Sequence, residues 1–239
     1  MLQGRTALVV GGASGIGRAI AAAYIAQGAA VVVADRAAVD PAELGLAGAV
    51  RLDVTDEKSV AAAVHEATQL VGQIDILVNS AGILTESPLA TMPLATWSET
   101  LAVDLTGVFL CCRAVLPDML ERGWGRIINI ASQLGIKGGR GLAHYAAAKA
   151  GVIGLTKSLA LEVSARGVLV NAIAPGPIDT PMVEGITEDW KAAKRAELPL
   201  GRFGRPEEVA PTAVLLASDP GGNLYVGQTL GPNSGDVMP

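Results

Sequence analysis

The chain has 239 residues and a formal net charge of −5, and 50% of it is hydrophobic while only 3% is aromatic. That length allows one large domain or two small ones, and the hydrophobic share is ample for a buried core. The acidic balance and the absence of a Lys/Arg run argue against nucleic-acid binding and against binding to anionic membranes. With few aromatics, aliphatic residues and glycine must fill the core, which favours layered α/β packing over a β-sandwich.

Short apolar runs alternate with helical patterns along the first half of the chain. Strands are predicted over four ranges: Thr6–Val10, Ala30–Ala34, Val50–Leu52 and Ile74–Asn79. Helices are predicted between them: from the glycine-rich turn to Gly28, from about Asp56 to Val71, and from about Trp97 to Arg122.

The second half continues the alternation. Strands are predicted over Arg126–Ile130, Val168–Ala174 and Gln228–Leu230, and helical segments over Tyr145–Ala165, Glu188–Ala196 and Pro206–Ser218. Parallel strands need crossover connections, which are right-handed within one sheet. The pattern therefore predicts a Rossmann-like, doubly wound parallel sheet of about seven strands in a single domain, 1–239. Its short substrate loop, around 177–200, has the weakest periodicity and is expected to be the most mobile segment.

The cysteines and the N-terminus indicate a cytoplasmic location. Cys111 and Cys112 are adjacent within an apolar helical pattern, which is typical of packed free thiols rather than of a disulfide. The N-terminus leads directly into a strand without a secretory signal, and no uninterrupted apolar run reaches the length of a membrane span. We expect a soluble cytoplasmic protein without a metal site.

A glycine-rich turn joins the first strand to its helix. Gly11, Gly15 and Gly17 follow the spacing G-x3-G-x-G, with Gly12 beside the first. Glycines let the backbone turn sharply and approach a pyrophosphate, while the helix N-terminus offers N–H donors. A tight strand–helix connection without any ligand is the alternative.

Asp35 ends the second strand and supports the interpretation that the glycine-rich turn binds the pyrophosphate of a dinucleotide. A carboxylate about 20 residues beyond such glycines can accept hydrogen bonds from ribose hydroxyls, and it repels a 2′-phosphate. Arg36 is the counter-argument, since arginine binds phosphate well. The pair favours NAD, with NADP as the alternative.

Further small or polar residues follow other strands at the same sheet edge, where open α/β sheets bind ligands. Asp53 and Val54 follow the third strand, and they line an adenine or belong to an ordinary helix start. Asn79, Ala81 and Gly82 end the fourth strand and leave room for a cofactor against the backbone.

Ser132, Tyr145 and Lys149 are the candidates for chemistry. The tyrosine and the lysine are four residues apart, so they share one face of a helix, while the serine ends a neighbouring strand. An adjacent ammonium favours the phenolate, and lowering the phenol pKa by about three units needs roughly 4 kcal/mol, which Lys149 and the positive nicotinamide ring of an oxidised cofactor would supply together. Tyr145 would then exchange a proton with an alcohol or carbonyl, and Ser132 would bind the same oxygen. An ordinary amphipathic pair is the alternative.

Together these motifs resemble the short-chain dehydrogenase/reductase family along essentially the whole chain. The segments GGASGIG, NSAG, NAIAPGPIDTPM and PLGRFGRPEEVA carry the resemblance with the Ser–Tyr–Lys spacing. It implies homotetramers and a cofactor site made of these residues: Gly11, Ser14, Gly15, Ile16, Gly17, Asp35, Arg36, Asp53, Val54, Asn79, Ala81, Gly82, Tyr145, Lys149, Pro175, Gly176, Ile178 and Thr180.

One position departs from the family pattern. Asp104 stands where the family usually has an asparagine that positions a water for proton relay to the lysine. Asp104 has nearly the same shape but only accepts hydrogen bonds when ionised. We expect the relay to survive with a modified pH profile, so the implied catalytic set is Ser132, Tyr145, Lys149 and Asp104.

The predicted function is NAD(H)-dependent hydride transfer between nicotinamide and a secondary alcohol or ketone. The alternatives are a dinucleotide-binding regulatory protein that has lost catalysis, and an NADPH-dependent 3-oxoacyl-thioester reductase. A sugar-nucleotide epimerase or dehydratase on the same fold would need a longer C-terminal region for its substrate.

Substrate contacts are expected from five mostly apolar positions near the catalytic set: Leu84, Gln133, Leu134, Pro177 and Met182. His144 is interpreted as a loop residue that faces away from the tyrosine. Lys137 and Arg140 are interpreted as solvated charges, and an anionic substrate is the alternative they leave open.

Overall fold

A seven-stranded parallel sheet runs through the molecule in the order β3-β2-β1-β4-β5-β6-β7. The computed structural model describes residues 1–183 and 187–238. The strands are β1 (Thr6–Val10), β2 (Ala30–Asp35), β3 (Gly48–Arg51), β4 (Ile76–Asn79), β5 (Gly125–Ile130), β6 (Val168–Ile173) and β7 (Thr229–Leu230). Chain order reverses between β1 and β4, which is the kind of place where such sheets bind ligands. The predicted doubly wound parallel fold is confirmed.

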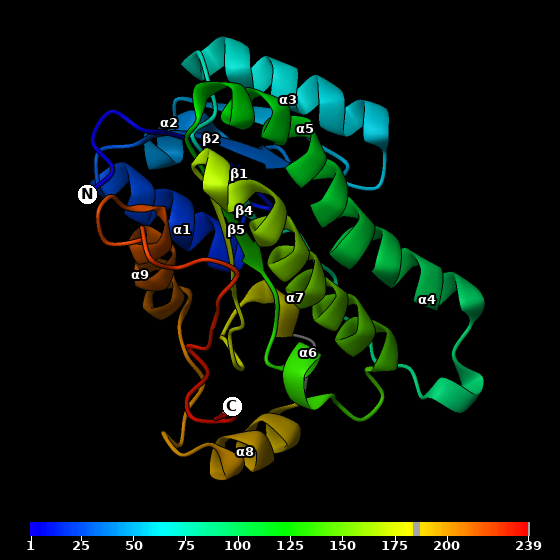
Figure 1. Ribbon diagram of the computed structural model, residues 1–239. Coiled ribbons are helices and arrows are strands. Elements are labelled where there is room, and N and C mark those ends of the chain that lie inside the picture. The colour runs from blue at the N-terminus through cyan, green and yellow to red at the C-terminus, as the bar shows by residue number, and fades with distance from the viewer. Residues whose placement is uncertain (184–186, 239) are drawn as a thin grey trace.

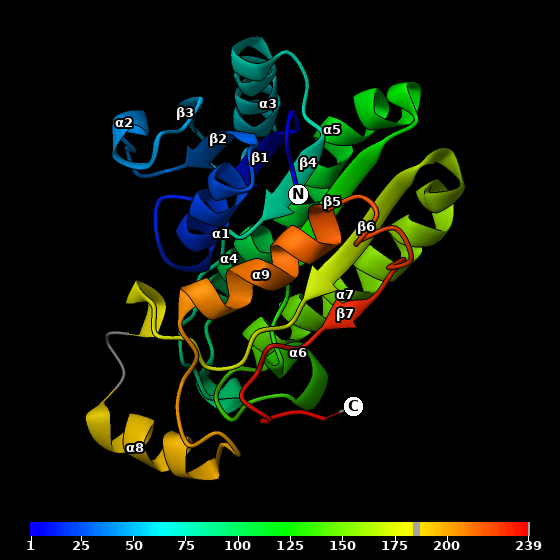
Figure 2. The ribbon, with the colours of Figure 1, turned by 90° about the vertical axis from the view of Figure 1, so that its left-hand side faces the viewer.

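Helices cover both faces of the sheet (Figures 1 and 2). One face is covered by α1 (Gly15–Ala26) and α9 (Pro206–Ala217), the other by α3 (Glu57–Val71), α5 (Gly107–Arg122) and α7 (Ala143–Val163). Shorter elements complete the described chain: α2 (Pro41–Leu44), α4 (Leu94–Leu101), α6 (Leu134–Lys137), α8 (Glu188–Glu197) and the 3₁₀ turns Leu89–Thr91, Ser164–Arg166 and Pro181–Val183.

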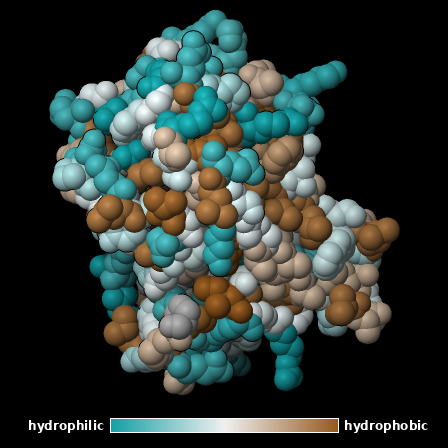
Figure 3. Space-filling view, viewed as in Figure 1, coloured by the Kyte–Doolittle hydropathy of each residue, from teal (hydrophilic) through white to brown (hydrophobic). Residues whose placement is uncertain are grey.

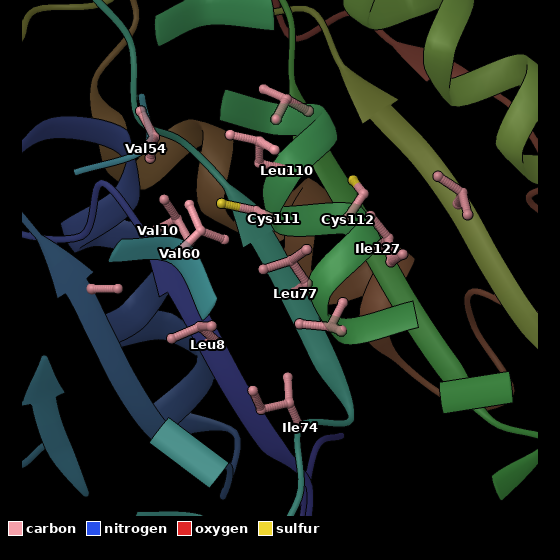
Figure 4. Close-up of a cluster of buried hydrophobic side chains, with 14 of the residues drawn as sticks. Leu8, Val10, Val54, Val60, Ile74, Leu77, Leu110, Cys111, Cys112 and Ile127 are labelled. Atoms are coloured by element: carbon pink, nitrogen blue, oxygen red, sulfur yellow. The ribbon is translucent and has the colours of Figure 1, made fainter. Parts of the chain in front are cut away.

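The larger core lies between the sheet and the layer formed by α3, α5 and α7 (Figure 4). Leu8, Leu77 and Ile127 from adjacent strands point into it, and Cys111 and Cys112 of α5 pack from the other side. Both thiols are buried and free, as predicted, and burial raises the pKa of Cys111 to about 12. They therefore behave as small apolar side chains.

The second core lies under α1 and α9 and is filled mainly by aliphatic side chains. Val9, Val33 and Ile76 meet Ile20 from α1, together with apolar residues of α9. Tyr24 is fully buried there, and its hydroxyl donates to the carbonyl of Ala213 at 3.1 Å. A sheet with buried residues on both faces accounts for the continuous apolar strands in the sequence.

The helix predicted from Trp97 to Arg122 differs from the structure in one functional detail. The helical run is Leu94–Arg122, but a π-helical turn, Ala102–Thr106, interrupts it between α4 and α5. This run alone, among the described residues, is long and apolar enough to cross a membrane by length and composition. In its most apolar stretch 44% of the residues are buried, and Val103, Cys111 and Val115 belong to the core.

The boundaries of several elements also differ from those expected. β3 begins at Gly48 and ends at Arg51, β4 begins at Ile76, and α7 begins at Ala143. The short helices α2 and α6 carry too few residues for a periodic signal. The expectation of mobility in 177–200 falls partly on 184–186, which lie outside the described residues.

Candidate active site

The glycine turn brings three backbone segments into contact. A Cβ on Gly17 would lie 2.1 Å from the carbonyl oxygen of Gly11, and a Cβ on Gly11 would lie 2.4 Å from the amide nitrogen of Ala81. Gly11 also has φ +75°, which favours glycine. Only residues without side chains fit at these two positions, so the turn after β1 lies directly against the chain that leaves β4.

The start of α1 fits an anionic ligand. Ser14 is its N-cap but makes no side-chain capping bond, and the first turn carries no acidic residue. The uncapped amides and the positive end of the helix dipole therefore face the turn. Thr180 lies beside this point, since a Cβ on Gly15 would be 3.3 Å from its methyl group. The residues present thus fit the pyrophosphate of a dinucleotide.

Asp35 is held next to the glycine turn by backbone bonds. Its Oδ2 accepts from the amide of Ala13 at 3.0 Å, and its Oδ1 accepts from the amide of Ala37 at 3.0 Å. Each oxygen keeps a further lone pair for a ligand hydroxyl. Arg36, by contrast, is exposed.

Asp53 makes mainly local bonds. Its Oδ1 accepts from the amide and the hydroxyl of Thr55, at 2.9 and 2.7 Å, and these bonds lower the pKa of Asp53. Val54 is buried against Gly107 of α5. Both residues follow β3 at the expected edge, where packing and turn formation already account for them.

Ser132, Tyr145 and Lys149 are brought together at the end of β5. All three are at least nine-tenths buried, and the lysine Nζ lies 5.6 Å from the centre of the tyrosine ring. Lys149 donates to the carbonyl of Ile130, the last residue of β5, at 3.1 Å. The Ser132 hydroxyl accepts from the amide of Leu134 at 3.1 Å.

Asp104 faces Lys149 from the π-helical turn. Its Oδ2 is 3.7 Å from the lysine Nζ, and its Oδ1 accepts from the amide of Ile83 at 2.8 Å. The side chain is fully buried, and Oδ2 has no hydrogen-bond partner among the described residues. Burial raises the pKa of Asp104, and the charge of Lys149 opposes that rise. Gly82 leaves the space beside both groups open.

The pKa of Tyr145 is raised, so Lys149 by itself does not produce the phenolate; the expected lowering relies also on the positive ring of an oxidised nicotinamide. Burial is the main cause and penalises the charged form. Lys149 lowers the pKa as expected, Asp104 raises it again, and a hydrogen bond from Ser132 lowers it. The carboxylate thus offsets part of the lysine's effect on the phenol.

Asn79 ends β4, as expected, and its side chain is buried. Its amide is 3% exposed and donates to Asn129 Oδ1 at 2.9 Å and to Cys112 Sγ at 3.3 Å. Asn129 in turn donates to Thr156 Oγ1 at 3.0 Å. The Asn79 side chain therefore ties β4 to β5, α5 and α7.

Two other expectations were wrong. His144 is not a loop residue: it lies in the first turn of α7, is fully buried, and bonds through Nε2 to the hydroxyl of Thr85 at 3.0 Å. Lys137 is not simply solvated, because its Nζ is 2.7 Å from Asp236 Oδ2. The sequence pattern near the C-terminus carries no signal for that carboxylate.

The remaining expected positions lie along the same edge. Ile178 is buried and pairs with Gly204, and the Pro175 carbonyl accepts from the amide of Gln133 at 3.1 Å. Among the substrate candidates, Gln133 is buried, Met182 is exposed, and the others are partly exposed: Leu84, Leu134 and Pro177.

Comparison with known proteins places these features in context. A family model described as enoyl-(acyl carrier protein) reductase matches residues 11–235. The chain is 41% identical over 246 residues to the 3-oxoacyl-[acyl-carrier-protein] reductase FabG of Thermotoga maritima, covering 99% of both chains. It is 40% identical over 221 residues to 2-dehydro-3-deoxy-L-rhamnonate dehydrogenase (NAD(+)) of Sphingomonas sp., covering 90% of this chain and 89% of the relative.

A solved structure matches as well. The crystal structure of gox2181 superposes with a TM-score of 0.93 at 34% sequence identity, covering 98% of this chain and 96% of that one.

The close contact at Gly17 generates a testable prediction. Gly17→Ala places a methyl group 2.1 Å from the Gly11 carbonyl, so the glycine turn must shift. If the turn binds a dinucleotide, the affinity for NADH and for NADPH, measured by fluorescence titration, should fall about tenfold or more, since a misplaced backbone loses its contacts with the ligand. Gly154→Ala is the control, because a Cβ there meets nothing within 4 Å and alanine favours the helix by about 1 kcal/mol. Equal NADH affinity in the two variants would contradict the role of the turn.

Proposed function

Because the chain belongs to the short-chain dehydrogenase/reductase family, whose members are oxidoreductases of alcohols and carbonyls that bind a nicotinamide dinucleotide, we propose that it transfers hydride between NAD and a secondary alcohol or ketone, with Tyr145 as the acid–base. One observation carries this proposal. Tyr145 and Lys149 share the face of α7 that meets Ser132 at the end of β5, in a buried site.

The three side chains divide the proton chemistry among them. A bound dinucleotide supplies the hydride acceptor or donor. Tyr145 takes the hydroxyl proton during oxidation and returns a proton to the carbonyl oxygen during reduction. Lys149 favours the phenolate by its charge, and Ser132 hydrogen-bonds the same substrate oxygen. Each pKa unit by which the phenol is made more acidic corresponds to about 1.4 kcal/mol.

The preference for NAD rests on Asp35. The carboxylate is fixed beside the glycine turn by two backbone amides, whereas Arg36 is exposed and free to turn towards solvent. A fixed negative charge at the ribose would repel a 2′-phosphate. We assign the pyrophosphate to the amides from Ser14 to Gly17, and the nicotinamide carboxamide to the 175–180 segment beside Gly15.

A second candidate is an NADPH-dependent 3-oxoacyl-thioester reductase. The similarity to a 3-oxoacyl-[acyl-carrier-protein] reductase along 99% of both chains favours it. The same Ser–Tyr–Lys chemistry would serve, with a thioester-linked ketone as the substrate. A regulatory protein without catalysis is less well supported, since Asp104 alone departs from the family's catalytic set.

The two candidates are separated by one panel of substrates and cofactors. Secondary alcohols, small ketones and a 3-oxoacyl thioester are assayed at 340 nm with NAD(H) and NADP(H) in parallel. We expect kcat/KM to be at least about tenfold higher with the non-phosphorylated cofactor, because the carboxylate of Asp35 would repel the 2′-phosphate. A tenfold ratio corresponds to a difference of about 1.4 kcal/mol in transition-state stabilisation. A preference for NADPH with the thioester would support the second candidate. If no combination of substrate and cofactor gave turnover, the result would contradict an enzymatic function.

Asp104 gives the site its own pH behaviour. We propose that it replaces the family's asparagine in the proton relay, accepting from Ile83 while its second oxygen faces Lys149. As a carboxylate it raises the pKa of Tyr145. Alcohol oxidation needs the phenolate, so the ionised aspartate moves the onset of oxidation to higher pH.

Asp104→Asn tests this assignment. Removal of the negative charge lowers the pKa of Tyr145, so the rise of kcat/KM for alcohol oxidation should shift to lower pH than in the unaltered enzyme. Asp118→Asn, at an exposed position on α5, is the matched control. An unchanged pH profile would contradict the electrostatic role of Asp104. An inert natural enzyme that the asparagine restores would show that no relay operates through the aspartate.

A homotetramer is our proposal for the assembly, and the cytoplasm is our proposal for its location. Apolar side chains are exposed on the face that carries α4, α5 and α7 (Figure 3). Leu94 of α4, Phe109 of α5 and Leu161 of α7 are exposed, and Leu161 is 85% exposed. Large exposed apolar groups of this kind mark contact surfaces. Size-exclusion chromatography with light scattering should give four times the 24.3 kDa chain mass. A monomer at micromolar concentration would contradict the proposal.

A further inference from the structure

The C-terminal tail passes between two elements that flank the candidate site. After β7 the chain runs through 231–238 and reaches the space between α6 and α8, as both ribbon views show (Figures 1 and 2). The amide of Gly176 donates to the Pro232 carbonyl at 3.1 Å, and that of Leu200 donates to the Ser234 carbonyl at 3.3 Å. The tail is therefore bonded to both ends of the substrate segment.

A tight turn fixes the direction of the tail. Asn233 is 7% exposed, accepts from the Gly235 amide at 3.0 Å and donates to the Val237 carbonyl at 2.8 Å. Ser234 has φ +58°, which makes it the one non-glycine residue with positive φ among those described. Side chains tolerate this conformation only where surrounding bonds impose it. The turn places the next residue, Asp236, in a defined position.

Asp236 bridges α6 and α8 with two strong ion pairs. Its Oδ2 lies 2.7 Å from Lys137 Nζ at the end of α6, and its Oδ1 accepts from Lys194 Nζ of α8 at 2.9 Å. The Gln133 side-chain amide also donates to Oδ2. The carboxylate is 7% exposed, and although burial opposes its charge, the bonds from both lysines hold the pKa of Asp236 below its usual value.

This bridge matters because α8 has little else to hold it. No residue of α8 is buried, so the hydrophobic effect contributes little to its attachment. Its other ion pairs, which involve Lys191, Glu188 and Glu197, lie within the helix itself. Arg195 stacks over Phe203, 5.3 Å from its ring centre. Among the described residues, the Lys194–Asp236 pair is thus the ion pair that joins α8 to another element.

The other arm of the bridge reaches the catalytic loop. Gln133 directly follows Ser132, is 4% exposed, and has its amide group turned to Asp236 because an ionised carboxylate can only accept. The backbone N–H of Gln133 donates to the Pro175 carbonyl. One carboxylate therefore contacts the residue after Ser132, the end of α6 and the substrate-side helix.

We propose that Asp236 is a positioning residue that fastens α8 to the loop carrying Ser132 and so sets the substrate side of the site. The inference rests on the proposed function, because it takes Ser132 to bind the reacting oxygen. Asp236 itself touches neither the cofactor residues nor Tyr145 in the contacts described. Its loss should consequently affect substrate binding more than cofactor binding.

The test is Asp236→Asn, which keeps the side-chain size and removes the charge that holds both lysines. We expect KM for the alcohol or ketone to rise about tenfold, kcat to stay within about twofold of the unaltered enzyme, and NADH affinity to stay unchanged. This pattern is the one expected when a mutation weakens substrate binding equally in the ground state and the transition state. Amide hydrogen exchange in 188–197 should accelerate about tenfold, since local opening follows the loss of local contacts. Asp118→Asn serves as the control and should change none of these quantities.

A double-mutant cycle assigns the effect to the bridge. Lys194→Met should raise KM and accelerate exchange in α8, and adding it to Asp236→Asn should change either quantity by less than about twofold, because the two groups act as one contact. Lys194→Met alone provides both readouts if Asp236→Asn does not fold.

Three results would overturn the proposal: unchanged KM and exchange, faster exchange with unchanged KM, or full additivity in the cycle. Inertness of the unaltered chain towards the whole panel would contradict the proposed function instead. In that case exchange in 188–197 would still decide whether Asp236 fastens α8.

Discussion

The buried ammonium of Lys149 must find partners, and its two partners come from separate parts of the chain outside its own helix. Its Nζ bonds the carbonyl of Ile130 at the end of β5 and lies 3.7 Å from Asp104 in the π-helical turn. An unpaired charge in a site only 4% exposed would cost several kcal/mol. The end of β5, the turn between α4 and α5, and the first turns of α7 therefore have to keep a fixed arrangement.

The π-helical turn is the device that makes this pairing geometrically feasible. An extra residue in the turn Ala102–Thr106 alters the direction of the side chains there, and Asp104 is fully buried as a result. Such turns are frequent at functional sites, because they re-aim a side chain without ending the helix. The same carboxylate accepts from Ile83 after β4, so through Lys149 it also links the segment after β4 to the end of β5.

The two sides of the site are built by different forces. On the cofactor side, backbones touch directly, with Gly11 against Ala81 and Gly17 against Gly11, so van der Waals packing leaves little freedom. On the substrate side, α8 buries no residue and is joined to the C-terminal tail by the Lys194–Asp236 ion pair, and Leu200, beyond the helix, adds a backbone bond to Ser234. The close-packed half therefore has less freedom to open locally than the half that depends on a few polar contacts.

The sequence by itself determined the layered fold, the glycine turn, Asp35 and the Ser132–Tyr145–Lys149 spacing, because apolar periodicity and turn residues are signals carried by neighbouring positions. It could not reveal that the Asn79 side chain bonds Asn129, that the helix takes a π-helical turn at Asp104, or that burial raises the pKa of Tyr145. The link between Gln133 and Asp236 joins residues 103 positions apart. Such features depend on which distant groups the tertiary structure brings together and how completely it removes them from water, and no local pattern encodes either quantity.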